Sequence, residues 1–140
     1  MPSNKRKFGD LGEDIAIKFL IKRGYQYIER NYRKKYGEID LIFTLGKKYV
    51  FIEVKTREKS SSDSFLPEFN VNFAKTKKLR HICKVYLAEH NLFPEAGWSI
   101  DVIAMTIDKT TSCTLPIKST TIRRVKNPFG LSGITKYNMI

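Results

Sequence analysis

Residues 37–57 read GEIDLIFTLGKKYVFIEVKTR, and this stretch decides the fold. Two apolar runs, 37–44 and 49–56, are joined by the short turn LGKK, which is typical of neighbouring antiparallel strands. Both runs are mainly apolar on both faces, yet Asp40, Glu53 and Lys55 stand inside them. We therefore expect two strands inside a sheet that is covered on both sides.

The flanking segments predict an α/β domain around these strands. Apolar periodicity predicts a helix over 10–23 that Gly24 ends, and aromatic and polar alternation predicts a strand over 25–32. Asn72 can cap a second helix, and 98–107 reads as a buried strand. A helix between the third and fourth strands predicts a parallel crossover, which gives a mixed sheet flanked by helices in the order αβββαβ.

The chain, residues 1–140, has the length of a single domain. We expect a basic N-terminal arm over 1–9, a long Ser-rich loop over 58–70 that is either functional or flexible, and a last strand over 120–125. The tail over 130–140 has no pattern that assigns it.

Charge is the most informative property of the composition. The chain has 26 Lys and Arg against 14 Asp and Glu, a formal net charge of +12. A small domain this basic predicts a polyanionic partner, with nucleic acid first and a merely cationic surface or an anionic membrane surface as alternatives. The two cysteines, Cys83 and Cys113, are too few and too far apart in sequence for the pattern of a disulfide framework or of a zinc site. With no secretory signal and no membrane-length apolar run, we expect a cytoplasmic protein that does not enter membranes.

The charged residues of the two central strands can form one cluster. Glu53 and Lys55 share a strand face, and pairing through the LGKK turn can bring Asp40 beside Glu53. Buried charges need compensation, either as a structural salt bridge or by a divalent cation such as Mg²⁺. Glu13 favours the cation, because it projects from the apolar arc of the first helix and has no apparent use unless it reaches the same cluster.

The chain resembles the PD-(D/E)XK nuclease superfamily, which has the restriction-endonuclease-like fold, and most of all its YraN-like branch, which is similar to Holliday-junction resolvases. The segments that carry the resemblance span most of the chain from Gly9 to Phe129: GEDIAIKFLIKRGY, RNYRKKYGEIDLI, FIEVKTR, the Lys-rich helix from Lys75, WSIDVIAM and IRRVKNPF.

The resemblance implies a role for each charged residue of the cluster. It implies that Asp40 and Glu53 bind Mg²⁺ or Mn²⁺, that Lys55 is the catalytic lysine, and that Glu13 is an auxiliary ligand or a water-orienting carboxylate. Ile39 stands where the superfamily's name has Pro.

Six basic residues are candidates for contact with nucleic acid. The run NYRKKY alternates tyrosines with cations, which suits backbone contact and base stacking, although a solvated basic turn is an equal interpretation. A lysine at a helix start can approach a phosphate or extend its ammonium into solvent. The candidates are Arg33, Lys34, Lys35, Arg57, Lys75 and Lys78.

From these features we expect a Mg²⁺-dependent nuclease that hydrolyses DNA, with branched or junction DNA as one class of substrate. The alternative is a nucleic-acid-binding protein that keeps the fold and does not cleave, and a protein–protein adaptor with a structural salt bridge ranks last. A junction substrate would favour a symmetric homodimer.

Overall fold

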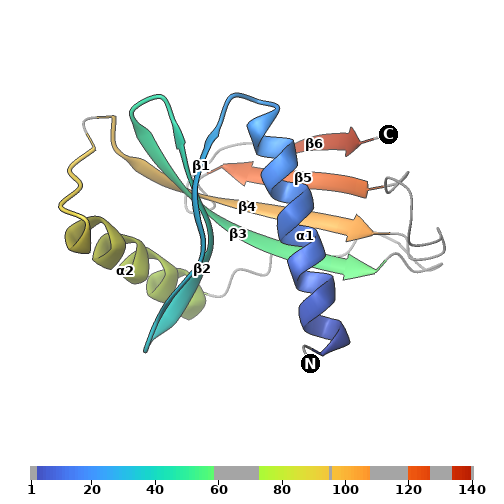
Figure 1. Ribbon diagram of the computed structural model, residues 1–140, viewed down its shortest axis with the longest axis horizontal. Helices are drawn as coiled ribbons and strands as arrows, with labels where there is room; N and C mark the ends of the chain where they lie inside the picture. The colour runs from blue at the N-terminus through green and yellow to red at the C-terminus, as the bar shows by residue number, and fades with distance from the viewer. Residues whose placement is uncertain (1–2, 59–72, 95, 108–119, 127–133, 140) are drawn as a thin grey trace.

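The computed structural model describes residues 3–58, 73–94, 96–107, 120–126 and 134–139 (Figure 1). Within these residues, two helices and six strands follow one another. Their bounds are α1 (Asn4–Ile21), β1 (Gln26–Lys34), β2 (Gly37–Leu45), β3 (Lys48–Glu58), α2 (Phe73–Glu89), β4 (Trp98–Ile107), β5 (Thr120–Lys126) and β6 (Ile134–Met139).

The six strands form one mixed sheet in the order β1-β2-β3-β4-β5-β6. β3 and β4 are parallel, with Tyr49 opposite Trp98 and Glu58 opposite Ile107, and the other neighbours are antiparallel. α2 connects the two parallel strands. The predicted meander, crossover and mixed α/β fold are therefore confirmed, and the architecture is consistent with a restriction-endonuclease-like fold.

The two helices cover opposite faces of the sheet, and α1 crosses its front in Figure 1. Val50 and Ile52 pack in the apolar cluster that contains α1, whereas Phe51 between them packs with α2. Successive side chains of a strand point to opposite faces. Both faces of the central strands are therefore buried, as the two apolar runs predicted.

The ends of the elements differ from the predictions in three places. α1 begins at Asn4 rather than at residue 10, because the Ser3 hydroxyl accepts a hydrogen bond from the Arg6 N–H and caps an earlier turn. Most of the predicted N-terminal arm is thus helical. β1 continues to Lys34, and part of the unassigned tail forms β6, which pairs with β5. Gly24, with φ of +86°, follows the end of α1 as expected.

β2 changes the faces of its side chains at Asp40. Ile39 and Ile42 pack in the α2 cluster, but Leu41 and Phe43 pack in the α1 cluster. Strict alternation would place Ile39 and Leu41 on the same face. Asn31 of β1, which lies between the pairs Arg30–Leu41 and Tyr32–Ile39, has a left-handed φ of +56°. The hairpin is therefore kinked at Asn31 and Asp40.

Neither described helix is long and apolar enough to cross a membrane.

Candidate active site

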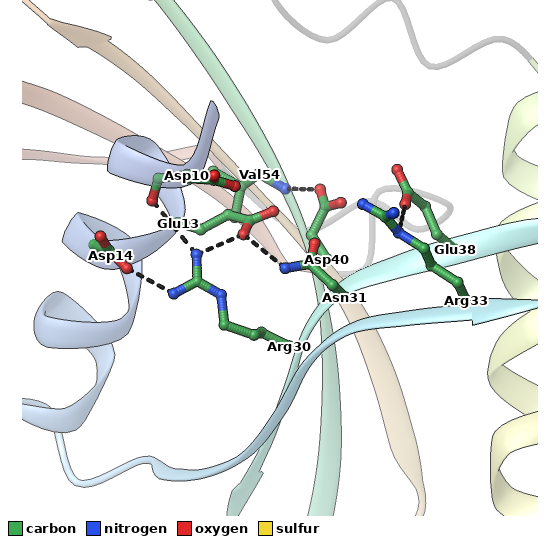
Figure 2. A network of polar contacts seen from close by, with 9 residues as sticks. All are labelled: Asp10, Glu13, Asp14, Arg30, Asn31, Arg33, Glu38, Asp40 and Val54. Atoms are coloured by element: carbon green, nitrogen blue, oxygen red, sulfur yellow. Dashed lines mark hydrogen bonds and ion pairs between the residues drawn. The ribbon is translucent and has the colours of Figure 1, made fainter. Parts of the chain in front are cut away.

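Asp40 lies where β2 separates from β3. The last β2–β3 pair is Leu41 with Ile52, so the next pair, Asp40 with Glu53, is missing from the ladder. The backbone N–H of Val54 donates instead to Oδ2 of Asp40, over 2.8 Å (Figure 2). The carboxylate thus occupies the fork between the two strands and replaces a ladder carbonyl as acceptor.

Glu53 and Lys55 follow this fork on β3. Ile52 and Val54 pack with α1, so alternation directs Glu53 and Lys55 to the opposite, α2 face. The negative charge of Glu53 contributes, after burial, to a raised pKa of the Cys83 thiol on α2, which is consistent with this face. Both side chains are half-buried. The packing of Ile52 and Val54 against α1 is consistent with the predicted shared face of Glu53 and Lys55.

Asp40 is half-buried, and negatively charged side chains act on its carboxyl group. Burial and then the charge of Glu53 raise the pKa of Asp40 to about 8, with smaller contributions from Glu13 and Glu38. The hydrogen bond from Val54 acts in the opposite direction and is outweighed. Glu53 and Glu13 thus both oppose the ionisation of Asp40, and a bound cation would relieve this repulsion.

Glu13 reaches the fork from α1 and is held by β1 (Figure 2). The Glu13 side chain is largely buried, and its Oε2 accepts hydrogen bonds from Arg30 at 2.8 Å and from Asn31 at 3.4 Å. Arg30 also binds Oδ1 of Asp14, over 2.6 Å. Burial opposes the charge of Arg30, but the hydrogen bonds to Asp14 and Glu13 prevail and raise its pKa.

Gly12 sets how closely α1 approaches the site. A Cβ atom at this position would lie 2.9 Å from Cβ of Thr56 on β3, and still nearer its Oγ1. Only a residue without a side chain allows this contact. The next residue in the helix is Glu13, so the close approach of Gly12 carries the Glu13 carboxylate toward Asp40.

Four predicted nucleic-acid contacts have described side chains, and all four are exposed. Arg33 pairs with Glu38 at 3.0 Å and Lys34 with Glu89 at 2.8 Å, so carboxylates offset part of their charge. Lys35 lies in the turn between β1 and β2, and Lys78 lies on α2. The side chains of the remaining two candidates, Arg57 and Lys75, lie outside the described residues.

Sequence reasoning missed Arg30 and Asn31, which position Glu13. Arg30 sits in the alternating run 25–32, where a strand arginine is expected to point into solvent. Its link to two acidic residues of α1 follows a register shift of β1 between Tyr27 and Glu29, which the alternation of the sequence does not show. An Asn in a strand was the only available signal, because Asn adopts left-handed φ more readily than most residues.

The acidic residues of the fork suit a hard divalent cation. Among the described residues, no three His, Cys, Asp or Glu side chains lie close enough together to hold a metal by themselves. Mg²⁺ usually takes only one or two carboxylates and completes its shell with water and substrate phosphate oxygens. Asp40 and Glu53 therefore form a donor pair of a suitable kind.

Comparison with known proteins gives one family. Residues 12–105 match the model of the uncharacterised protein family UPF0102. The UPF0102 protein of Chloroflexus aurantiacus strain J-10-fl is 41% identical over 106 residues, which are 76% of this chain and 84% of the relative. The UPF0102 protein of Caldanaerobacter subterraneus subsp. tengcongensis is 44% identical over 88 residues, 63% of this chain and 70% of the relative. That of Clostridioides difficile strain 630 is 37% identical over 89 residues, 64% and 76% of the two chains.

Proposed function

This chain belongs to the uncharacterised protein family UPF0102, and we propose that it is a Mg²⁺- or Mn²⁺-dependent nuclease that hydrolyses phosphodiester bonds in DNA, with branched DNA as one class of substrate. The observation that carries the proposal is the placement of Asp40. Its carboxylate lies in the fork between β2 and β3, where burial and the charge of Glu53 oppose its ionisation. A purely structural pair would join opposite charges rather than like ones.

The acidic fork fits a divalent cation. Asp40 and Glu53 would hold the ion, and the ion would polarise a phosphate oxygen and lower the pKa of a water molecule. The hydrogen bond from Val54 fixes one oxygen of Asp40, so the carboxylate is oriented before any ligand binds. This orientation supports a binding role for Asp40.

Lys55 and Glu13 complete the proposed site from two directions. Lys55 shares the strand face of Glu53, where an ammonium can orient the attacking water and stabilise the negative charge that grows on the phosphate. Glu13 enters from α1, and Arg30 and Asn31 hold its Oε2. A carboxylate held in this way can accept a hydrogen bond from water and orient it.

Cleavage of a panel of labelled substrates tests the proposal. Wild-type protein should cut at least one of duplex, single-stranded, flap and four-way-junction DNA in the presence of Mg²⁺ or Mn²⁺, and EDTA should stop the reaction. Asp40→Asn should reduce the rate by about 100-fold or more, because the amide carries no charge for the ion. Glu38→Gln is the matched control, since this exposed carboxylate lies on the same strand in an ion pair with Arg33.

Thermal unfolding gives a second readout that needs no turnover. Mg²⁺ at tenfold its dissociation constant should stabilise wild-type protein by about 1.4 kcal/mol and leave Asp40→Asn nearly unchanged. Absence of metal-dependent cleavage on every substrate, with salt-dependent DNA binding intact, would instead identify a binding protein with a nuclease-like fold. Equal stabilisation of both proteins by Mg²⁺ would remove Asp40 from the proposed metal site.

A further inference from the structure

Tyr36 and His81 form an exposed aromatic pair between the β1–β2 turn and α2. Their ring centroids lie 5.3 Å apart and the planes are tilted by 52°. Tyr36 is 49% exposed and His81 is exposed as well. Aromatic rings that contact each other and still face solvent offer a surface on which a third ring can stack.

Lysines surround this aromatic pair. Lys77, Lys78 and Lys84 lie four and three residues before His81 and three residues after it, so they share its face of α2. All three are exposed, as is Lys35, which precedes Tyr36 in the turn. Four exposed lysines from two elements thus lie on the side of the molecule that carries the aromatic pair.

Basic residues of β1 form ion pairs with the carboxylates near the turn. Glu38 accepts a hydrogen bond from Nε of Arg33 at 3.0 Å. Glu89 pairs with Lys34 and also accepts from the Tyr32 hydroxyl at 2.6 Å, and these contacts lower the pKa of Glu89. The surface around Tyr36 and His81 therefore keeps a positive balance.

The turn is fixed on α2 rather than projecting freely. The Tyr32 ring packs edge-on against Tyr86, with centroids 5.0 Å apart, and the contacts with Glu89 join β1 to the end of α2. Gly37 also lies against α2, because a Cβ there would be 3.7 Å from Cδ1 of Ile82. Tyr36 is therefore held in place before any partner binds, which lowers the entropy cost of stacking.

We propose that Tyr36 and His81 bind an unpaired base of a nucleic acid by stacking, while the surrounding lysines contact the adjacent phosphates. Proteins that bind single strands without sequence preference combine a positively charged surface with exposed aromatic rings. In a continuous duplex the base faces already stack on one another, so the aromatic pair selects substrates that contain a single-stranded stretch.

This inference rests on the proposed function in its choice of ligand, and it gives that function a class of substrate. Tyr36 lies in the turn just before β2 and precedes Asp40 by four residues, which span at most about 13 Å of extended chain. A base held at Tyr36 would thus place neighbouring nucleotides of the same strand near the acidic fork. We expect cleavage close to a junction between single-stranded and paired nucleic acid.

Fluorescence anisotropy in EDTA measures binding without cleavage. The probes are a labelled single strand of about 20 nucleotides, longer than the site of a typical single-strand binder, and a blunt duplex of the same sequence. Tyr36→Ala should weaken single-strand binding roughly 5- to 100-fold and duplex binding less than about 2-fold. Tyr36→Phe keeps the ring and should bind like wild type. Phe93→Ala, which removes an 89% exposed ring outside the pair, is the control.

A 2-aminopurine base in the single strand reports stacking directly. Wild-type protein should quench the fluorescence of this base, and Tyr36→Ala should abolish the quenching. The circular dichroism spectrum of the Tyr36→Ala protein should match that of wild type, which shows that the variant is folded. If Tyr36→Ala weakens both probes equally, or neither, the stacking site is wrong and the proposed nuclease function stands. If wild-type protein binds neither probe in a salt-dependent way, this inference fails, and the cleavage panel with branched DNA decides the proposed function separately.

Discussion

At the scale of the residue, the placement of Asp40 costs folding free energy. A carboxyl group prefers to be ionised in water, but burial and the charge of Glu53 oppose ionisation in the folded protein and raise the pKa of Asp40 to about 8. An unfolded Asp has a pKa of about 3.9. The fold retains this group although its charge is unfavourable in the absence of a cation, which is the pattern expected of a ligand-binding residue.

The pH dependence of stability should reveal this cost. Between about pH 4 and pH 8 the folded protein keeps a proton that the unfolded chain has lost, so stability falls as pH rises through this range. Below about pH 4 both states are protonated and the cost vanishes. Asp40→Asn should therefore raise the free energy of unfolding at pH 8.5 by on the order of 1 to 3 kcal/mol, and change it little at pH 4.

Urea unfolding at the two pH values, in EDTA, provides the measurement. Glu38→Gln changes an exposed carboxylate of the same strand and should give a much smaller difference between the two conditions. A loss of stability in Asp40→Asn at pH 8.5 would show that Asp40 is a favourable structural anion and not a strained one.

At the scale of the element, α1 positions Glu13 next to the sheet. The contact between Gly12 and Thr56 fixes the height of the helix above β3, and the bonds from Arg30 to Asp14 and Glu13 fix its rotation. The two restraints lie within one turn of α1. The position of Glu13 therefore depends on the contacts of its neighbours in α1 as well as on those of the Glu13 side chain.

Two glycines of α1 should respond to alanine in opposite directions. Gly12→Ala places a Cβ against Thr56 and should destabilise the protein by about 1 to 3 kcal/mol, as overpacking usually does. A Cβ at Gly9 would meet nothing within 4 Å, so Gly9→Ala should stabilise by about 0.5 to 1 kcal/mol through helix propensity. Urea unfolding of both variants checks the signs.

The effect of Gly12→Ala should be relieved by Thr56→Ala. The nearest atom to the new Cβ is Oγ1 of Thr56, which the second substitution removes. The double variant should regain part of the lost stability, which is a coupling that two independent sites would not show. If the two losses simply add, α1 does not contact β3 at Gly12.

Much of this architecture could be predicted because its signals are local. The LGKK turn fixed the pairing of β2 with β3, and the helix between β3 and β4 fixed the parallel pair. The alternation of β3 placed Glu53 and Lys55 together. These features follow from periods and loop lengths, which a single sequence contains.

The rest could not be predicted because it depends on contacts between distant segments. The kink at Asn31 and Asp40 reverses the alternation of β2, and a strand pattern gives no sign of such a reversal. A register shift of β1 between Tyr27 and Glu29 precedes Arg30, which contacts α1. β6 was missed because its six residues, ITKYNM, mix polar and apolar side chains without a clear period.

At the scale of the whole molecule, the exposed cations of the described residues lie on both faces of the sheet. α2 and the β1–β2 turn carry the exposed lysines around Tyr36, and α1 carries further exposed cations, such as Lys18, on the opposite face of the sheet. A polyanion attracted by total charge alone would use both faces. A polyanion bound at one site would use only the face near α2.

The salt dependence of duplex binding should separate these two cases. Each phosphate contact contributes about −0.9 to the slope of log K against log salt, so removing one contacting lysine should flatten the slope by about that amount. Lys78→Gln, on the face of His81, should reduce the slope by about 0.9, whereas Lys18→Gln, an equal change of charge on α1, should leave it unchanged. Titrations at several salt concentrations measure both slopes. Equal reductions of the slope in the two variants would mean that the protein attracts DNA through its overall charge. The α2 face would then not be the binding surface.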